Sequence, residues 1–88
     1  MEFERLLRIP ELKAQFGKGR SAIYQDIKDG TCPPLIPVST RKNGSAAAAA
    51  LPASEAQALI RARIAGKSDD ELRALVRDLI AKRQLQAA

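Results

Sequence analysis

Six side chains between positions 18 and 28 are of types that can contact DNA: Lys18, Arg20, Ala22, Tyr24, Gln25 and Lys28. Small, aromatic, amide and basic groups on one exposed helix can read base edges in a major groove. Lys18 and Arg20 would stand at the N-terminus of that helix, where backbone N–H groups already favour a phosphate. The alternative for both is a plain solvated charge. Tyr24 is expected to be half-buried with its hydroxyl exposed, because it lies one residue from the Ile23–Ile27 stripe.

Two short amphipathic helices joined by a tight turn would position these side chains. Leu12 and Phe16 lie four residues apart, as do Ile23 and Ile27, so each pair marks one apolar helix face. The turn between them holds two glycines, which permit the positive φ angles of a sharp stop, and Ser21 is a good N-cap for the second helix. This is a helix-turn-helix pattern, although ordinary helical bundles contain similar pairs.

A β-hairpin is expected after the two helices. Residues 35–40 favour a short edge strand, because Pro37 interrupts them. The following Asn-Gly pair would supply the two positive φ angles of a tight turn. Arg41 and Lys42 at the tip would be placed to touch a phosphate backbone or a minor groove, unless the tip is only a solvated loop.

The return strand of this hairpin is difficult to assign. Residues Ala46 to Ala50 have the best helix propensity known, whereas alanine is poor in strands. Pro52 limits any helix here to less than two turns. A weak strand or an irregular return is therefore favoured, with helix and disorder left open.

Two further helices are expected towards the C-terminus. Each starts at a capping-box pattern, Ser54 to Gln57 and Ser68 to Glu71, and the first would end near Gly66. The last helix carries an apolar stripe made of Leu72, Leu75, Val76, Leu79 and Ile80. This stripe would either complete the domain core or join two copies as a homodimer.

Composition narrows the class of protein. The 88 residues carry a formal net charge of +5 and a pI of about 9.9, which favours a polyanionic partner such as double-stranded DNA. There is no histidine and a single cysteine, Cys32, which excludes a Cys/His zinc site, a Ser-His-Asp triad and an intrachain disulfide. We expect no enzyme activity, no metal and no cofactor. No apolar run is long enough to span a membrane, and a cytoplasmic location is the default.

The arrangement resembles the AlpA family of small prophage-encoded transcriptional regulators, relatives of phage excisionases and of MerR-type winged helices. The resemblance extends from about Leu6 to Ile64 and rests on Leu6-Leu7-Arg8-Ile9-Pro10-Glu11, Gly19-Arg20-Ser21-Ala22-Ile23-Tyr24, Gly30 with Cys32-Pro33-Pro34, and Ser54-Glu55-Ala56. It implies that the second helix enters a major groove. The contacts it implies are Arg20, Ser21, Ala22, Tyr24, Gln25 and Lys28, with Arg41 and Lys42 on the wing. Where the family has a Gly-Trp pair this chain has Ala50-Leu51, so the wing is expected to be weakly anchored.

The prediction for the whole chain is a mainly α winged helix-turn-helix with a short two-stranded β-hairpin and an additional C-terminal helix. Residues 1–66 would form the DNA-binding domain, and residues 67–88 a helix for packing or dimerisation. The expected function is a sequence-specific double-stranded DNA-binding transcriptional regulator of phage or mobile-element origin. The alternatives are an excisionase-like factor that bends DNA during recombination and a protein-interaction module without DNA binding.

Overall fold

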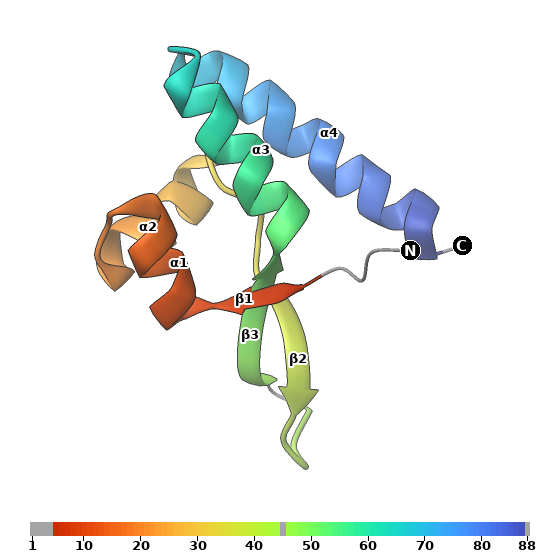
Figure 1. Cartoon of the computed structure of the whole chain (residues 1–88). Helices are drawn as coiled ribbons and strands as arrows, with labels where there is room; N and C mark the ends of the chain where they lie inside the picture. Colours follow the sequence, from red (N-terminus) through yellow and green to blue (C-terminus); the bar gives the residue numbers. More distant parts are fainter. Residues whose placement is uncertain (1–4, 45, 88) are drawn as a thin grey trace.

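The computed structural model describes residues 5–44 and 46–87. Within these ranges the chain is mainly helical, with four helices and one three-stranded antiparallel sheet (Figure 1). In chain order the elements are β1 (Leu6–Arg8), α1 (Ile9–Phe16), α2 (Arg20–Asp29), β2 (Ile36–Thr40), β3 (Ala46–Pro52), α3 (Ala53–Ile64) and α4 (Asp69–Ala87). Figure 1 shows α3 and α4 side by side at one end, while β2 and β3 extend together beyond the helices.

The sheet is centred on β3, which pairs with β1 on one side and with β2 on the other. Leu7 of β1 lies opposite Leu51, and both side chains are fully buried. The prediction of a two-stranded hairpin is therefore wrong, since the segment before the first helix adds a third strand. Three residues are too few to show strand periodicity, and pairing with β3 is what makes this segment a strand. The alanine-rich segment is a strand, as the sequence favoured, because β1 and β2 supply hydrogen-bond partners along its two edges.

The connection between β2 and β3 does not use the expected turn. The N–H of Gly44 donates to the carbonyl of Arg41 at 2.9 Å, and Gly44 has a φ of 87°. Asn43 does not adopt a positive φ. A two-residue hairpin loop requires special φ angles at its centre, but this connection is longer, so a single glycine is sufficient. Strand β2 is an edge strand, as Pro37 predicted, and its register with β3 shifts just after that proline.

Glycines in the left-handed conformation end both α1 and α2. Gly17 has a φ of 67° and donates its N–H to the carbonyl of Lys13 at 3.0 Å, and Gly30 has a φ of 84°. Helix α2 begins at Arg20 with Gly19 as its N-cap, so the prediction of Ser21 as the N-cap is wrong. The positive φ expected of Gly19 is also wrong: its φ is −76°, in the extended conformation that an N-cap needs, and glycine is an acceptable residue there. Ser21 therefore lies within the first turn.

The two C-terminal helices begin in different ways. Helix α3 begins at Ala53 with Pro52 as its N-cap, so the capping box expected from Ser54 is wrong. Pro52 is still part of β3, and its fixed φ leads the chain directly from the strand into the helix. At α4, the N–H of Ser68 donates to Glu71 Oε1 at 3.1 Å and the N–H of Glu71 donates to Ser68 Oγ at 3.2 Å. The second capping box is therefore confirmed.

Helix α4 closes the hydrophobic core of the chain. Leu72 and Val76 are buried in one cluster with Leu7, Leu12 and other apolar residues of the first three helices and the sheet. Leu75 and Ile80 pack against the same cluster, and Leu79 is partly exposed. The homodimer expected through this stripe stays a prediction, with two of its five residues already buried inside the single chain.

Two arginines attach α4 to the rest of the chain. Arg83 donates from Nε to Glu55 Oε2 at 2.7 Å and from Nη2 to Glu55 Oε1 at 2.5 Å. It therefore forms a bidentate pair with a buried carboxylate at the start of α3. Arg73 donates from Nε to the carbonyl of Asp29 at 2.9 Å, at the C-terminal end of α2. Helix α4 therefore holds both α2 and α3 in place.

Candidate nucleic-acid interface

A groove of about 630 Å³ separates the two N-terminal helices from the β2–β3 ribbon. It is lined by Arg8, Ile9, Pro10, Lys13, Arg20, Tyr24, Arg41, Ala48 and Ala49. These residues come from β1, α1, α2, β3 and the loop after β2, so the groove exists only when the sheet is assembled. Of the predicted contacts, it brings together Arg20 and Tyr24 of α2 and Arg41 of the loop.

Each basic side chain of the groove is placed by its element. In β1, buried Leu7 alternates with Arg8, which is exposed and lies opposite Ala50 of β3. In α1, Lys13 is exposed beside buried Leu12. Arg20 stands at the first residue of α2, and Arg41 directly follows β2.

The groove carries an unbalanced positive charge. Arg8, Lys13, Arg20 and Arg41 line it together with no acidic residue. None of these four makes an ion pair with any residue of the described ranges. Seven other cations of the described chain do make such pairs: Arg5, Lys18, Arg63, Lys67, Arg73, Lys82 and Arg83. Uncompensated positive charge on a concave surface creates a potential that attracts polyanions.

Arg20 and Tyr24 interact within the groove. The guanidinium carbon of Arg20 lies 5.6 Å from the centroid of the Tyr24 ring, which is a cation–π distance. Tyr24 is 43% exposed, so its expected half-burial is confirmed. The ring restricts the Arg20 side chain while leaving its charge free of any carboxylate, because a π face does not neutralise the guanidinium.

The remaining predicted residues of α2 lie outside the groove on the exposed surface of the helix. Ser21, Ala22, Gln25 and Lys28 are all exposed. Gln25 Nε2 donates to Asp29 Oδ1 at 3.0 Å, so an amide contact to a base would require this hydrogen bond to open. Lys42 is exposed in the loop that follows β2, next to Arg41.

Lys18 is a predicted contact whose charge is already paired within the chain. Its ammonium is ion-paired with the carboxylate of Asp26, and both side chains are partly buried. The pair links the turn after α1 to the middle of α2 and lines a second cavity, not the basic groove. In this conformation the ion pair fixes the turn against α2, and the charge of Lys18 is already neutralised.

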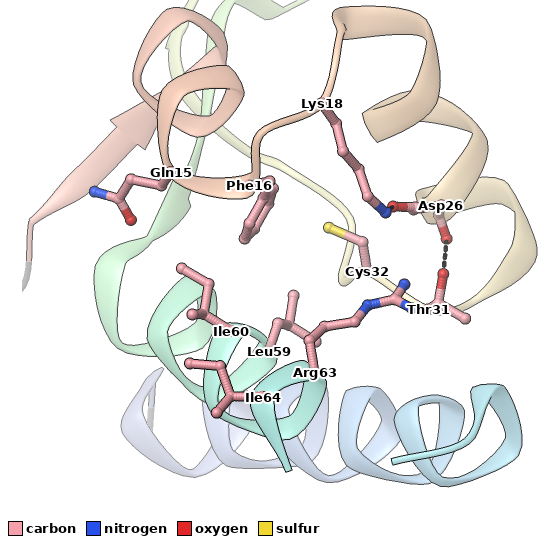
Figure 2. A pocket seen from close by; sticks show the side chains of 10 residues that line it. All are labelled: Gln15, Phe16, Lys18, Asp26, Thr31, Cys32, Leu59, Ile60, Arg63 and Ile64. Atoms are coloured by element: carbon pink, nitrogen blue, oxygen red, sulfur yellow. Dashed lines mark hydrogen bonds and ion pairs between the residues drawn. The ribbon is translucent and has the colours of Figure 1, made fainter. Parts of the chain in front are cut away.

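The second cavity lies between the two N-terminal helices and α3 and has a volume of about 240 Å³ (Figure 2). The Sγ atom of Cys32 is part of its wall. Burial raises the pKa of the Cys32 thiol to about 11, and the negative charge of Asp26 contributes in the same direction. The thiol is therefore protonated and weakly nucleophilic at neutral pH.

Sequence reasoning missed Arg8 and Lys13 as candidate contacts. Both are basic residues next to a buried leucine, and that alternation is the signal that could have found them. For Arg8 this signal is weak in the sequence, because the strand character of β1 depends on a partner more than forty residues away.

No protein-family model, curated protein or solved structure matched the chain in the comparisons. In the described ranges no helix is both long and apolar enough to cross a membrane, and no cluster of metal-binding side chains is present.

Proposed function

We propose that the chain is a sequence-specific double-stranded DNA-binding protein of the winged helix-turn-helix type. Helix α2 enters a major groove, and the β2–β3 ribbon is the wing that lies against the neighbouring backbone. The observation that carries the proposal is the groove between them, in which four cations have no ion-pair partner among the residues that the structure describes. The resemblance to prophage regulators extends the proposal to transcription control in a phage or mobile element.

The contacts divide into two groups by their position. Arg8, Lys13, Arg20 and Arg41 would bind phosphates, because they face one concave surface that can follow a DNA backbone. The exposed face of α2 would read bases through Ala22, Gln25 and Lys28. Lys18 is left out of the phosphate contacts, since binding a phosphate would break its ion pair with Asp26.

Salt-dependent binding tests the phosphate group. Each cation that neutralises a phosphate contributes about 0.9 to the slope of log K against log salt. Arg20→Gln and Lys13→Gln should each reduce the slope by about that amount and weaken selected and random duplexes evenly. Arg77→Gln is the matched control, because Arg77 is exposed on α4 without an ion-pair partner in the described ranges and lies outside the groove.

The assay is fluorescence anisotropy on duplexes selected from a random pool, compared with unselected duplexes. An equal loss of slope for Arg77→Gln and for the groove variants would mean that net charge alone attracts DNA, and would refute the groove. A chain that binds no duplex at low salt would refute the whole proposal. Gln25→Ala should change the selected sequence without changing the slope, because an amide contact to a base releases no counterion.

An excisionase-like role would use the same interface and would differ in the bend imposed on the DNA. Energy transfer between the two ends of a bound duplex measures that bend. A straight bound duplex is expected for a simple operator-binding regulator, and a strong bend would favour the architectural alternative. A module without DNA binding has less support, because the stripe of α4 that would serve a partner has Leu72 and Val76 in the core.

A further inference from the structure

The cavity shown in Figure 2 has walls from four parts of the chain. Phe16 ends α1, Lys18 belongs to the turn, Cys32 follows α2, and Ile60 and Ile64 belong to α3. Its volume of about 240 Å³ is below the roughly 300–1,000 Å³ of sites for drug-sized ligands. An occupant must therefore be small, such as a short alkyl chain or a single ring.

The wall on the α3 side is apolar. Leu59, Ile60 and Ile64 face the cavity from α3, and Phe16 faces them from the end of α1 (Figure 2). Ile64 is 81% exposed, so a large aliphatic side chain stands in water at the mouth of the cavity. An alkyl group inserted here would remove this apolar surface from water, which is favourable in proportion to the area covered.

The charged groups of the wall leave one net positive charge. Lys18 and Asp26 are ion-paired and neutralise each other. The third charged group is the guanidinium of Arg63, which extends from α3 towards the segment that carries Thr31 (Figure 2). Its nearest carboxylate is Asp69 at 3.8 Å, and both side chains of that pair are about half exposed or more, so the pair holds Arg63 only weakly.

We propose that this cavity binds a small amphipathic monocarboxylate, with its alkyl or ring part against Phe16, Ile60 and Ile64 and its carboxylate on Arg63. Guanidinium and carboxylate form paired hydrogen bonds, which gives the head group a defined orientation. The proposal is independent of DNA binding, because none of the groove residues contributes to this cavity.

Octanoate is the probe, with octan-1-ol and octylammonium as ligands of the same chain length and different head groups. Titration followed by amide chemical shifts should give saturable changes at Phe16 to Lys18, at Thr31 and Cys32, and along the end of α3. Octanoate should bind about threefold to fivefold more tightly than octanol, the range expected for a partly exposed ion pair. Octylammonium should bind more weakly than either.

Two pairs of variants separate the charge from the fold. Arg63→Gln should remove the preference for octanoate over octanol, while Arg61→Gln, on an exposed residue of α3 outside the cavity, should keep it. Ile64→Asp should weaken octanoate binding more than Ile64→Lys does, because both remove the apolar contact at the mouth and only the aspartate repels the carboxylate. The absence of any saturable shift up to about 10 mM octanoate would overturn the proposal, since that limit corresponds to less than about 3 kcal/mol of binding. Equal binding of the three probes would overturn the assignment of Arg63 as the head-group site.

Discussion

Removal of Arg83 should destabilise the protein strongly, because it leaves a buried carboxylate without its partner. The Glu55 side chain is only 7% exposed and accepts two hydrogen bonds from Arg83, at 2.7 and 2.5 Å. Breaking a fully buried ion pair from one side costs about 3–5 kcal/mol. Arg83 itself is 19% exposed and lies in the last turns of α4, which can open to admit water. We therefore expect Arg83→Met to lower the free energy of unfolding by about 2–3 kcal/mol.

Urea denaturation followed by circular dichroism measures this change, and heating should show a fall in Tm of about 10–20 °C. Lys82→Met is the matched control, because the adjacent Lys82 pairs with Asp78 at 3.2 Å with both side chains more than half exposed. That exposed pair should contribute less than about 0.5 kcal/mol. The double variant Glu55→Leu with Arg83→Met should regain most of the loss, since no charge then remains buried. A loss for Arg83→Met no larger than that for Lys82→Met would refute the reasoning.

Gly30→Ala should destabilise the protein by about 1 kcal/mol in urea denaturation, because an alanine would be strained at a φ of 84°. Gly19→Ala should cost less, about 0.5 kcal/mol, because its φ is negative and open space surrounds it, so that only a poorer N-cap results; equal effects would contradict this cause. Hydrogen bonds from Ser68 lower the pKa of Glu71 below its ordinary 4.5, so this stabilisation is present above pH 4.5 and is lost as the pH falls through the lower folded value. The difference in urea midpoint between the wild type and Glu71→Ala should therefore shrink at pH values below that range, and an undiminished difference there would count against a stabilising role of the Glu71 carboxylate in the capping box. Alkylation of Cys32 at pH 8 should be slow in the folded protein and fast in urea, because its pKa of about 11 leaves little thiolate; rapid alkylation without urea would show that the thiol is accessible.

The helices were predictable because their ends are encoded locally. The reciprocal bonds of Ser68 and Glu71 and the left-handed glycines at 17 and 30 follow from residue types at fixed spacing. The start of α2 was misplaced by two residues because Gly19 and Ser21 are both acceptable caps, and their difference in energy is only a few tenths of a kcal/mol. Local sequence therefore predicts that the helices form, but it does not determine the exact residue at which each one begins.

The sheet and the groove depend on contacts that local patterns do not contain. Leu6 to Arg8 becomes a strand only opposite Ala50 to Pro52, and that pairing is what brings Arg8 into the groove. Lys18 was expected to bind a phosphate at the N-terminus of α2. Its ammonium instead forms an ion pair with Asp26, eight residues later in the sequence. The DNA contacts predicted from the sequence therefore lacked Arg8, whose position depends on the pairing of β1 with β3.

The alanines of β3 determine how much room the basic groove has. Ala48 and Ala49 line it with single methyl groups, opposite the side chains of α1 and α2. A strand with the branched residues that strands usually prefer would fill part of this space without changing any charge. Ala49→Leu would thus narrow the groove and keep all four cations. This single substitution therefore tests the effect of groove shape separately from the effect of charge. Alanine has a low strand propensity, but its small side chain leaves space in the basic groove that a larger side chain would fill.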